Sequence, residues 1–378
     1  MKKLLALTLI MAMVLVSFAG CSSKSPTTKD NTTPGVTSAP GTTTAPATNN
    51  SDIQVTFIPK LTGNAFFESA NKGAQSYAAK WGFKVDYEGD PTASAAAQVA
   101  VINKAVQQGT NAISISSVDA AGIKDALLAA TAAGVTVTTW DSDVDPSARR
   151  VMVSQGTPEQ LGQMLVQMGF DSLKERGKNP DTDAIKYVWH YSNATVTDQN
   201  SWQVEGEKYI KATYPNWVNV APDNYYSNQD AEQAISVGES ILSANSDIDL
   251  IICNDSTALP GQAQAAQNKG LTAKDVTITG FAAPNSMKQY VNDGILTRWG
   301  LWDCGVQGAI GVYMAYYIAS GHDIKVGDKI DIPEIGTVEV MPNSVLDPAA
   351  DVSNTSSGVV LLPERTVFTK DNMNNFDF

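Results

Sequence analysis

The sequence predicts an α/β fold divided into two lobes, each built on a parallel β-sheet. Short β-rich segments alternate with helical segments, and Gly82, Gly109 and Gly134 follow the ends of successive helical segments. Strand, helix, glycine and strand in this order are typical of right-handed βαβ units. The same rhythm begins again after Thr157, and residues 52–378 amount to about twice a common domain size. Two lobes are therefore favoured over one.

The elements of the first half follow one another closely. Residues 53–58 form a β-rich run, and residues 66–81 form a helical stretch that contains alanine and glutamine and ends at Gly82. The pattern then repeats through strand 83–87, helix 93–108, strand 112–116, helix 120–133 and strand 135–139.

The second half begins with a predicted helix at residues 158–176. It continues through strand 184–189, helix 202–214, helix 230–244, strand 250–252, helix 259–269 and strand 276–280. In open α/β sheets, ligands bind beyond the carboxyl ends of the strands. The residues that directly follow each strand are therefore the candidates for a binding site.

Residues 1–20 have the features of a secretory signal. Lys2 and Lys3 supply a positive charge, residues 4–16 are apolar but too few for a spanning helix, and small residues follow. The end of this segment, Ala19-Gly20-Cys21, resembles the bacterial lipobox, which implies that Cys21 is lipidated and becomes the first mature residue. The alternative is an ordinary signal peptide with a cysteine there by chance.

Residues 21–51 are composed almost entirely of Thr, Pro, Ser, Ala, Asn and Gly. Such a segment has no apolar period and cannot bury a face, so we expect an extended tether between the lipid anchor and the folded part. A long tether is more useful under a thick cell wall than in a narrow periplasm. We therefore expect an extracytoplasmic protein anchored to the outer face of a Gram-positive cell membrane.

Composition excludes several classes of protein. The chain carries 26 basic and 39 acidic residues, a formal charge of −13. This acidic balance argues against sequence-independent binding to the phosphates of nucleic acid. Its three cysteines form no CxxC pair and no zinc spacing, and His190 and His322 stand far apart. The GxSxG elbow, the Walker loop and the GxGxxG fingerprint are absent. The sequence predicts neither a metal nor a cofactor.

Polar and aromatic side chains follow the predicted strands. They are Lys60 and Phe66 after the first strand, Asp141 after strand 135–139, Asp198 and Gln199 after strand 184–189, and Asn254 and Ser256 after strand 250–252. Charged groups and amides bind hydroxyls, and aromatic rings pack on C–H faces, so this set suits a small polyol. Taken singly, Lys60 could be a surface lysine and either aspartate a cap or turn residue. Their shared strand-end position favours a site.

Several of these loops carry motifs that are similar to those of one known family. The motifs are Ile58-Pro59-Lys60-Leu61 with Gly63 and Phe66-Phe67, Thr139-Trp140-Asp141-Ser142-Asp143, Gln155-Gly156-Thr157-Pro158, Thr195-Val196-Thr197-Asp198-Gln199-Asn200, Gly300-Leu301-Trp302-Asp303, Asp331-Ile332-Pro333 and Leu361-Leu362-Pro363-Glu364-Arg365. They resemble LsrB-type autoinducer-2-binding proteins, which have the sugar-binding type I periplasmic-binding fold. The resemblance runs from about residue 53 to Phe378.

The resemblance implies two doubly wound, Rossmann-like lobes joined by a hinge. Its implied division is an N-terminal lobe of residues 52–156 and 285–335 and a C-terminal lobe of residues 157–284 and 336–378. The chain would cross between them near residues 155–157, near 283–285 and after about 327. The lobes would close over the ligand and bury it.

The resemblance also implies a function. The protein would be a non-catalytic, monomeric receptor that delivers its ligand to the permease subunits of an ABC importer. The ligand would be autoinducer-2, a cyclic hydrated form of 4,5-dihydroxy-2,3-pentanedione without boron. Lys60 would donate to ring hydroxyls, Asp141 would accept from a pair of them, and Asp198 and Gln199 would accept from the facing lobe. Phe66 and Trp302 would supply apolar walls.

Two positions depart from the family pattern. The family has proline and alanine around the aspartate after strand 250–252, where this chain has Asn254 and Ser256. Two added polar side chains could change selectivity, so a receptor for a pentose or deoxyhexose, such as ribose or rhamnose, is the main alternative. A secreted carbohydrate-active enzyme that uses Asp141 and Asp198 is a more distant one. A transcription regulator of this fold would need an N-terminal helix-turn-helix. In this chain the predicted signal and tether occupy that position, so this alternative is set aside.

Overall fold

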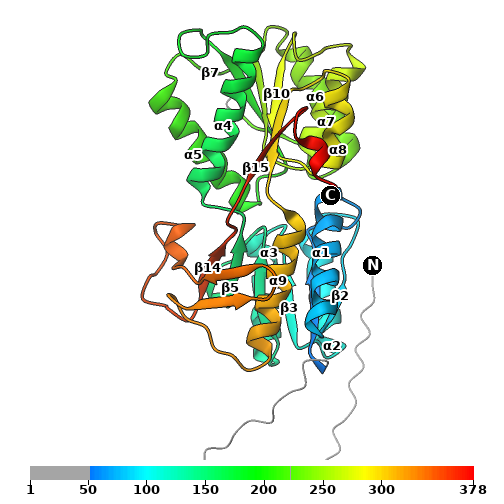
Figure 1. Cartoon of the computed structure of the whole chain (residues 1–378), viewed down its shortest axis with the longest axis vertical. Coiled ribbons are helices and arrows are strands. Elements are labelled where there is room, and N and C mark those ends of the chain that lie inside the picture. Colours follow the sequence, from blue (N-terminus) through cyan, green and yellow to red (C-terminus); the bar gives the residue numbers. More distant parts are fainter. Residues whose placement is uncertain (1–51, 222) are drawn as a thin grey trace, which may run out of the picture. The chain divides into compact units, whose positions relative to one another are not determined.

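Two parallel sheets organise the part of the chain that the computed structural model describes, residues 52–221 and 223–378 (Figure 1). The expected signal peptide, the lipidated Cys21 and the tether lie outside these residues. Within them, no helix combines the length and the apolar character that crossing a membrane requires.

The first sheet has the strand order β14-β5-β4-β3-β1-β2, and every neighbouring pair is parallel. Its strands are β1 (Gln54–Ile58), β2 (Lys84–Tyr87), β3 (Ala112–Ile115), β4 (Thr136–Trp140), β5 (Val151–Ser154) and β14 (Gly358–Leu361). Val55 and Phe57 pack with α1 (Ala65–Trp81) and α9 (Cys304–Ala319), whereas Ile58 packs with α2 (Ala95–Gln107) and α3 (Ala120–Ala132). This alternation covers both faces of the sheet with helices.

The second sheet has the order β10-β9-β6-β7, and β8 also pairs with β6. Its strands are β6 (Lys186–Tyr191), β7 (Val218–Asn219), β8 (Tyr225–Tyr226), β9 (Leu250–Cys253) and β10 (Thr277–Gly280). In Figure 1, α4 (Pro158–Glu175) and α5 (Thr197–Thr213) lie on one side of this sheet, and α6 (Ala231–Ala244), α7 (Ala258–Asn268) and α8 (Pro284–Asn292) lie on the other. The predicted class, two doubly wound α/β lobes, is confirmed.

The chain passes between the two sheets at three places. The first crossing is at residues 155–157, between β5 and α4. The second is at residues 302–303, between β11 (Arg298–Leu301) and α9, and the third is at residues 362–365, between β14 and β15 (Thr366–Thr369). The strands β11 and β15 pair with each other, so the second and third crossings run side by side.

The expected second and third crossings are wrong. Helix α8 packs on α7 and β11 lies beside β10, so residues 285–301 belong to the second lobe. Strand β14 pairs with β5, so residues 336–361 belong to the first lobe, together with the hairpin of β12 (Lys329–Ile332) and β13 (Gly336–Glu339). Such pairing joins segments far apart in the chain, and local periodicity contains no information about it.

Helix α9 is buried around most of its circumference and its half-buried positions are also apolar or aromatic, so it carries no amphipathic period. It packs directly on α1, where a Cβ atom at Gly73 would lie 2.1 Å from the carbonyl oxygen of Gly305, and one at Gly308 would lie 2.1 Å from that of Ala70. Glycines therefore allow the two backbones to touch. This contact fixes the helix that begins directly after the second crossing.

Candidate functional site

Side chains from both lobes line a cavity at the carboxyl ends of the strands. The lining residues are Lys60, Phe66, Phe67, Asp141, Gln199, Trp202, Gln229, Asn254, Asp255, Ser256, Thr257, Phe281, Leu301 and Trp302. The cavity that they enclose is small, about 20 Å³. Because its walls come from both lobes, separation of the lobes would enlarge it.

Lys60 and Asp141 form a buried ion pair in the first lobe. Lys60 follows β1 and Asp141 follows β4, two strands separated in the sheet by β3 alone, and Lys60 Nζ lies 3.1 Å from Asp141 Oδ2. Both residues are less than 5% exposed, at 3% and 4%. The hydroxyl of Ser116, at the end of β3, donates to the same carboxylate oxygen at 2.7 Å. Asp141 has a left-handed backbone (φ 59°), a conformation that aspartate tolerates better than most residues.

Three carboxylates surround this one lysine. Burial by itself lowers the pKa of Lys60, but the charges of Asp141, Asp198 and Asp255 outweigh it and raise the pKa. Burial, with a contribution from Asp141, raises the pKa of Asp198 and of Asp255 to about 6 each. Lys60 therefore stays charged, and the site holds more buried carboxylates than cations to pair them.

Asp198 stands beside the cavity rather than in its lining. It lies in the first turn of α5, which begins at Thr197 and not at residue 202 as predicted. Ser142, from the loop after β4, donates to Asp198 Oδ1 at 2.6 Å, and Gln155 Nε2 lies 3.4 Å from Oδ2. The carboxylate thus contacts the first lobe and the first crossing.

Gln199 and Asn254 hold each other in place on the second lobe. Asn254 Nδ2 donates to the backbone oxygen of Gln199 at 3.1 Å, and Ser192 Oγ donates to the Gln199 side chain. Both Gln199 and Asn254 are buried and line the cavity. The loop after β9 and the start of α5 therefore form one polar wall.

Ser256 also reaches the other lobe. Its hydroxyl donates to Asn64 Oδ1 at 3.3 Å, while Asn64 Nδ2 donates to Thr257 Oγ1 at 3.3 Å. Asn64 is the N-cap of α1. The neighbouring Asp255 accepts from the backbone N–H groups of Thr257 and Ala258, at 3.1 and 2.6 Å, at the start of α7.

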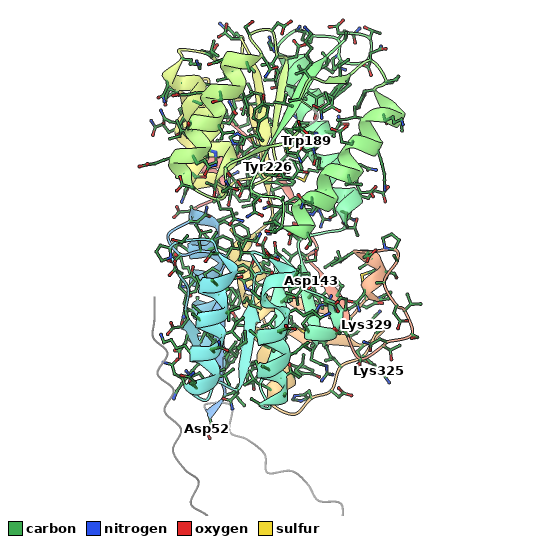
Figure 2. The ribbon with its side chains drawn as sticks, turned by 180° about the vertical axis from the view of Figure 1, so that it is seen from behind. Asp52, Asp143, Trp189, Tyr226, Lys325 and Lys329 are labelled. Carbon is green, nitrogen blue, oxygen red and sulfur yellow. The ribbon has the colours of Figure 1, made fainter. Side chains whose placement is uncertain are left out.

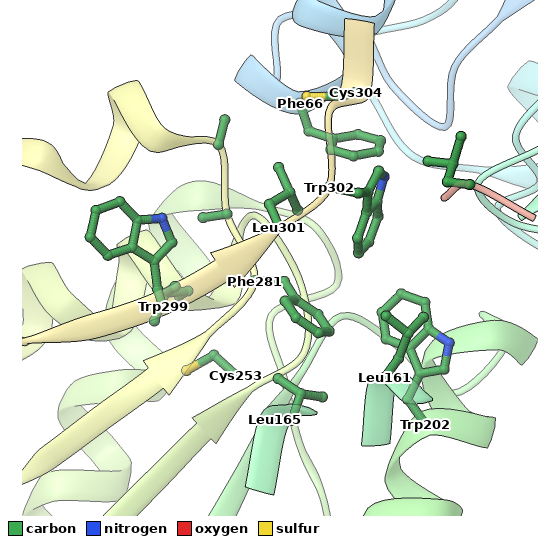
Figure 3. Packing of buried hydrophobic residues seen from close by; sticks show 14 of the residues in the cluster. Phe66, Leu161, Leu165, Trp202, Cys253, Phe281, Trp299, Leu301, Trp302 and Cys304 are labelled. Atoms are coloured by element: carbon green, nitrogen blue, oxygen red, sulfur yellow. The ribbon is translucent and has the colours of Figure 1, made fainter. Parts of the chain in front are cut away.

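Four aromatic side chains form the apolar wall (Figure 3). The Trp302 ring centroid lies 5.8 Å from that of Phe66, 5.5 Å from Phe281 and 6.0 Å from Trp202, each time edge to face. Trp302 stands on the second crossing, and its indole N–H donates to Gln307 Oε1 at 2.6 Å. Such ring faces pack on the C–H faces of a sugar ring.

The structure brings most of the predicted residues together. Lys60, Phe66, Asp141, Gln199, Asn254, Ser256 and Trp302 line the cavity, and Asp198 lies next to it. Phe67, Asp255 and Leu301 stood in the recognised loops and motifs but were assigned no role, and sequence analysis missed Trp202, Gln229, Thr257 and Phe281. Phe281 directly follows β10, so the strand-end rule could have found it. Gln229 follows β8, whose two residues are too few to be recognised as a strand.

Within the described residues, the histidines and cysteines lie outside the cavity lining. Burial lowers the pKa of His190 to about 4, and its Nδ1 lies 3.1 Å from Gln262 Oε1. Cys253 and Cys304 are buried free thiols, and burial raises the pKa of both well above the ordinary value. Among the described residues, no group of three His, Cys, Asp or Glu side chains could hold a metal ion.

The side chains of both lobes are drawn in Figure 2. It shows Trp189 and Tyr226 in the second lobe and Asp143 in the first. Asp143 and Arg149 form a second ion pair at 2.6 Å, and Arg149 also donates to the carbonyl of Gly358 at 2.8 Å. This ion pair therefore helps attach β14 to the first lobe.

Comparison with known proteins gives concordant results. A model of the periplasmic binding protein domain matches residues 55–323. The solved structure of LsrB from Clostridium saccharobutylicum in complex with AI-2 is 86% identical, with a TM-score of 0.86, and the match covers 86% of this chain and 100% of that one.

More distant relatives share the fold. The ribose import binding protein RbsB of Bacillus subtilis (strain 168) is 22% identical over 281 residues, which are 74% of this chain and 81% of that protein. An ABC transporter solute-binding protein from Clostridium phytofermentas, solved with L-rhamnose, is 20% identical with a TM-score of 0.76, over 87% of this chain and 99% of that one.

Proposed function

The chain belongs to the periplasmic binding protein family, and from this premise we propose that it is an extracytoplasmic receptor that captures autoinducer-2 and delivers it to an ABC importer. The observation that carries the proposal is the 86% identity, over that chain's whole length, to a receptor solved with AI-2. The cavity lining supports it, since a buried cation, a carboxylate and amides face aromatic walls between the two lobes.

The proposed ligand is the cyclic, boron-free tetrahydroxytetrahydrofuran form of autoinducer-2. Lys60 donates to ring hydroxyls and Asp141 accepts from them, while Gln199 and Asn254 bind from the second lobe. Phe66 and Trp302 enclose the apolar face of the ring. Hydrogen bonds to charged groups are the stronger kind, so a few of them account for most of the roughly 8 kcal/mol of a micromolar complex.

Asp198 and Ser256 act partly through closure. Each is hydrogen-bonded to a residue of the first lobe, to Ser142 and Asn64 respectively. Such bonds form only when the lobes approach, so they favour the closed state around the ligand. We propose that the importer senses this closed state, and that the ligand leaves chemically unchanged.

The remaining parts of the proposal concern location. A lipid on Cys21 and a tether over residues 21–51 would hold the receptor at the outer face of the cell membrane, as a monomer near the importer. Globomycin, which blocks lipoprotein signal cleavage, would then cause the uncleaved form to accumulate. Cys21→Ala would release the protein into the medium.

A receptor for a pentose or a deoxyhexose is the second candidate. The observation that favours it is the polar pair Asn254 and Ser256, since the amide and the hydroxyl lie on the cavity wall and could bind additional sugar hydroxyls. A ribose or rhamnose receptor would use the same hinge and the same lysine–aspartate pair.

One experiment separates the two candidates. The purified protein is incubated with autoinducer-2, washed and denatured, and the released molecule is assayed with a reporter strain, while ribose and rhamnose are titrated by calorimetry. Release of active autoinducer without heat from the sugars supports the first candidate, and sugar heat without released autoinducer supports the second. Asp141→Ala is the matched variant and should abolish binding in either case.

A further inference from the structure

Gln229 lines the cavity, and none of the roles assigned above involves it. The residue lies in the loop between β8 and α6 and is only 5% exposed. Its side-chain Nε2 is buried and has no hydrogen-bond partner among the described residues. A buried amide donor without a partner is unfavourable, and most such groups in proteins are paired.

The backbone at this position is also strained. Asn228 and Gln229 both have left-handed conformations, with φ of 52° and 59°. Asn228 is held by a hydrogen bond from its N–H to the carbonyl of Ser192 at 2.6 Å, and the next turn is closed by Asp230 N–H donating to Ser227 at 3.0 Å. Left-handed glutamine is uncommon, and strain of this kind concentrates at functional sites.

Asn254 supplies the complementary group. It lines the same cavity, is 1% exposed and uses Nδ2 to donate to the Gln199 carbonyl. Its Oδ1 is buried and has no partner within the described part of the chain. Two residues of the second lobe that line one cavity therefore carry one unpaired donor and one unpaired acceptor.

We propose that Gln229 is a ligand-binding residue, whose Nε2 donates to a ligand oxygen while Asn254 Oδ1 accepts from a ligand hydroxyl. The inference rests on the proposed function and specifies it further. Only a hydroxyl can donate to Asn254, because a carbonyl or ether oxygen has no hydrogen to offer. The neutral pair thus selects a cyclic polyol that turns a hydroxyl toward the second lobe, whereas Lys60 and Asp141 bind it from the first.

The test is Gln229→Leu, with Gln233→Leu as the matched control on the exposed part of α6. Calorimetry with autoinducer-2 should show about tenfold weaker binding for Gln229→Leu and less than a twofold change for Gln233→Leu. The melting temperature of unliganded Gln229→Leu should equal or exceed that of the wild type, because the substitution removes an unpaired buried donor. Unchanged affinity would overturn the proposal, and so would a loss of affinity accompanied by a lower melting temperature.

If the leucine variant does not fold, Gln229→Met is the test variant, because it preserves the length of the side chain and also removes the amide. Failure of the proposed function gives a different result, because the wild type itself would then not bind autoinducer-2. If it binds ribose or rhamnose instead, the same variants are titrated with that sugar. A tenfold loss then supports the role of Gln229, and unchanged sugar affinity overturns it.

Discussion

The Ser142 hydroxyl of the first lobe donates a hydrogen bond to the Asp198 carboxylate of the second lobe at 2.6 Å. Ser142 follows β4, whereas Asp198 lies in the first turn of α5, so the bond exists only when the two lobes approach each other. The bond adjoins the cavity, because Asp141, which precedes Ser142, and Gln199, which follows Asp198, both line it. Closure and ligand binding therefore involve neighbouring side chains.

We expect Ser142→Ala to weaken ligand binding about three- to tenfold. The substitution leaves a half-buried carboxylate oxygen without its donor in the closed state, and the open state loses nothing. Calorimetry with autoinducer-2 measures the change. Ser147→Ala, in the exposed turn after the same strand, is the control and should bind like the wild type. Equal affinities for both variants would contradict a role of the bond in closure.

We expect Lys60→Met to destabilise the unliganded protein by about 3 to 5 kcal/mol at pH 7. It removes the buried cation that faces Asp141, Asp198 and Asp255, and a buried charge without a partner is costly. Urea unfolding gives the free energy. The double variant Lys60→Met/Asp141→Asn should recover part of the loss but not the binding. A single variant as stable as the wild type would show that the pair contributes little.

The stability of the unliganded protein should rise as the pH falls from 7 to about 5. The pKa values of Asp198 and Asp255 are raised to about 6 by burial, whereas in the unfolded chain they lie near 3.9. Between these values the folded protein binds more protons, so the free energy of unfolding increases on acidification, by on the order of 2 kcal/mol. Above pH 6 both carboxyl groups are ionised in the folded protein, and the unfavourable burial of their charges lowers the free energy of unfolding.

Urea unfolding at pH 7, 6 and 5 measures this dependence. Asp255→Asn should reduce the slope, since asparagine can still accept from the first N–H groups of α7 but does not titrate. A free energy of unfolding that falls steadily between pH 7 and pH 5 would contradict the prediction.

Gly73→Ala should destabilise the first lobe by more than about 3 kcal/mol. Its Cβ atom would lie 2.1 Å from the carbonyl oxygen of Gly305, so α1 and α9 would have to separate. Gly305→Ala is the control, because the nearest atom to its Cβ is the side chain of Asp303 at 3.2 Å. Thermal unfolding compares the two variants, and similar losses in both would show that the helices do not pack as closely as described.

Local sequence pattern was sufficient for the central strands of both sheets and for the site residues that directly follow them. Strands β1, β4 and β9 are short apolar runs, and their ends could be recognised, which is how Lys60, Asp141 and Asn254 were found. The start of α5 was missed because Thr197 to Ser201 are polar and carry no apolar period, and Asp198 was therefore expected in a loop.

The sequence by itself determined the alternation of strands and helices, the class of the fold and the strand-end side chains, because each depends on neighbours in the chain. The tertiary structure decided which strands pair, and hence that β14 joins β5 and that Trp302 stands on the crossing between the lobes. It also decided that Ser142 meets Asp198 and that Gln229 lines the cavity. These relations join segments far apart in the chain, and their free energy comes from packing and burial that no local pattern encodes.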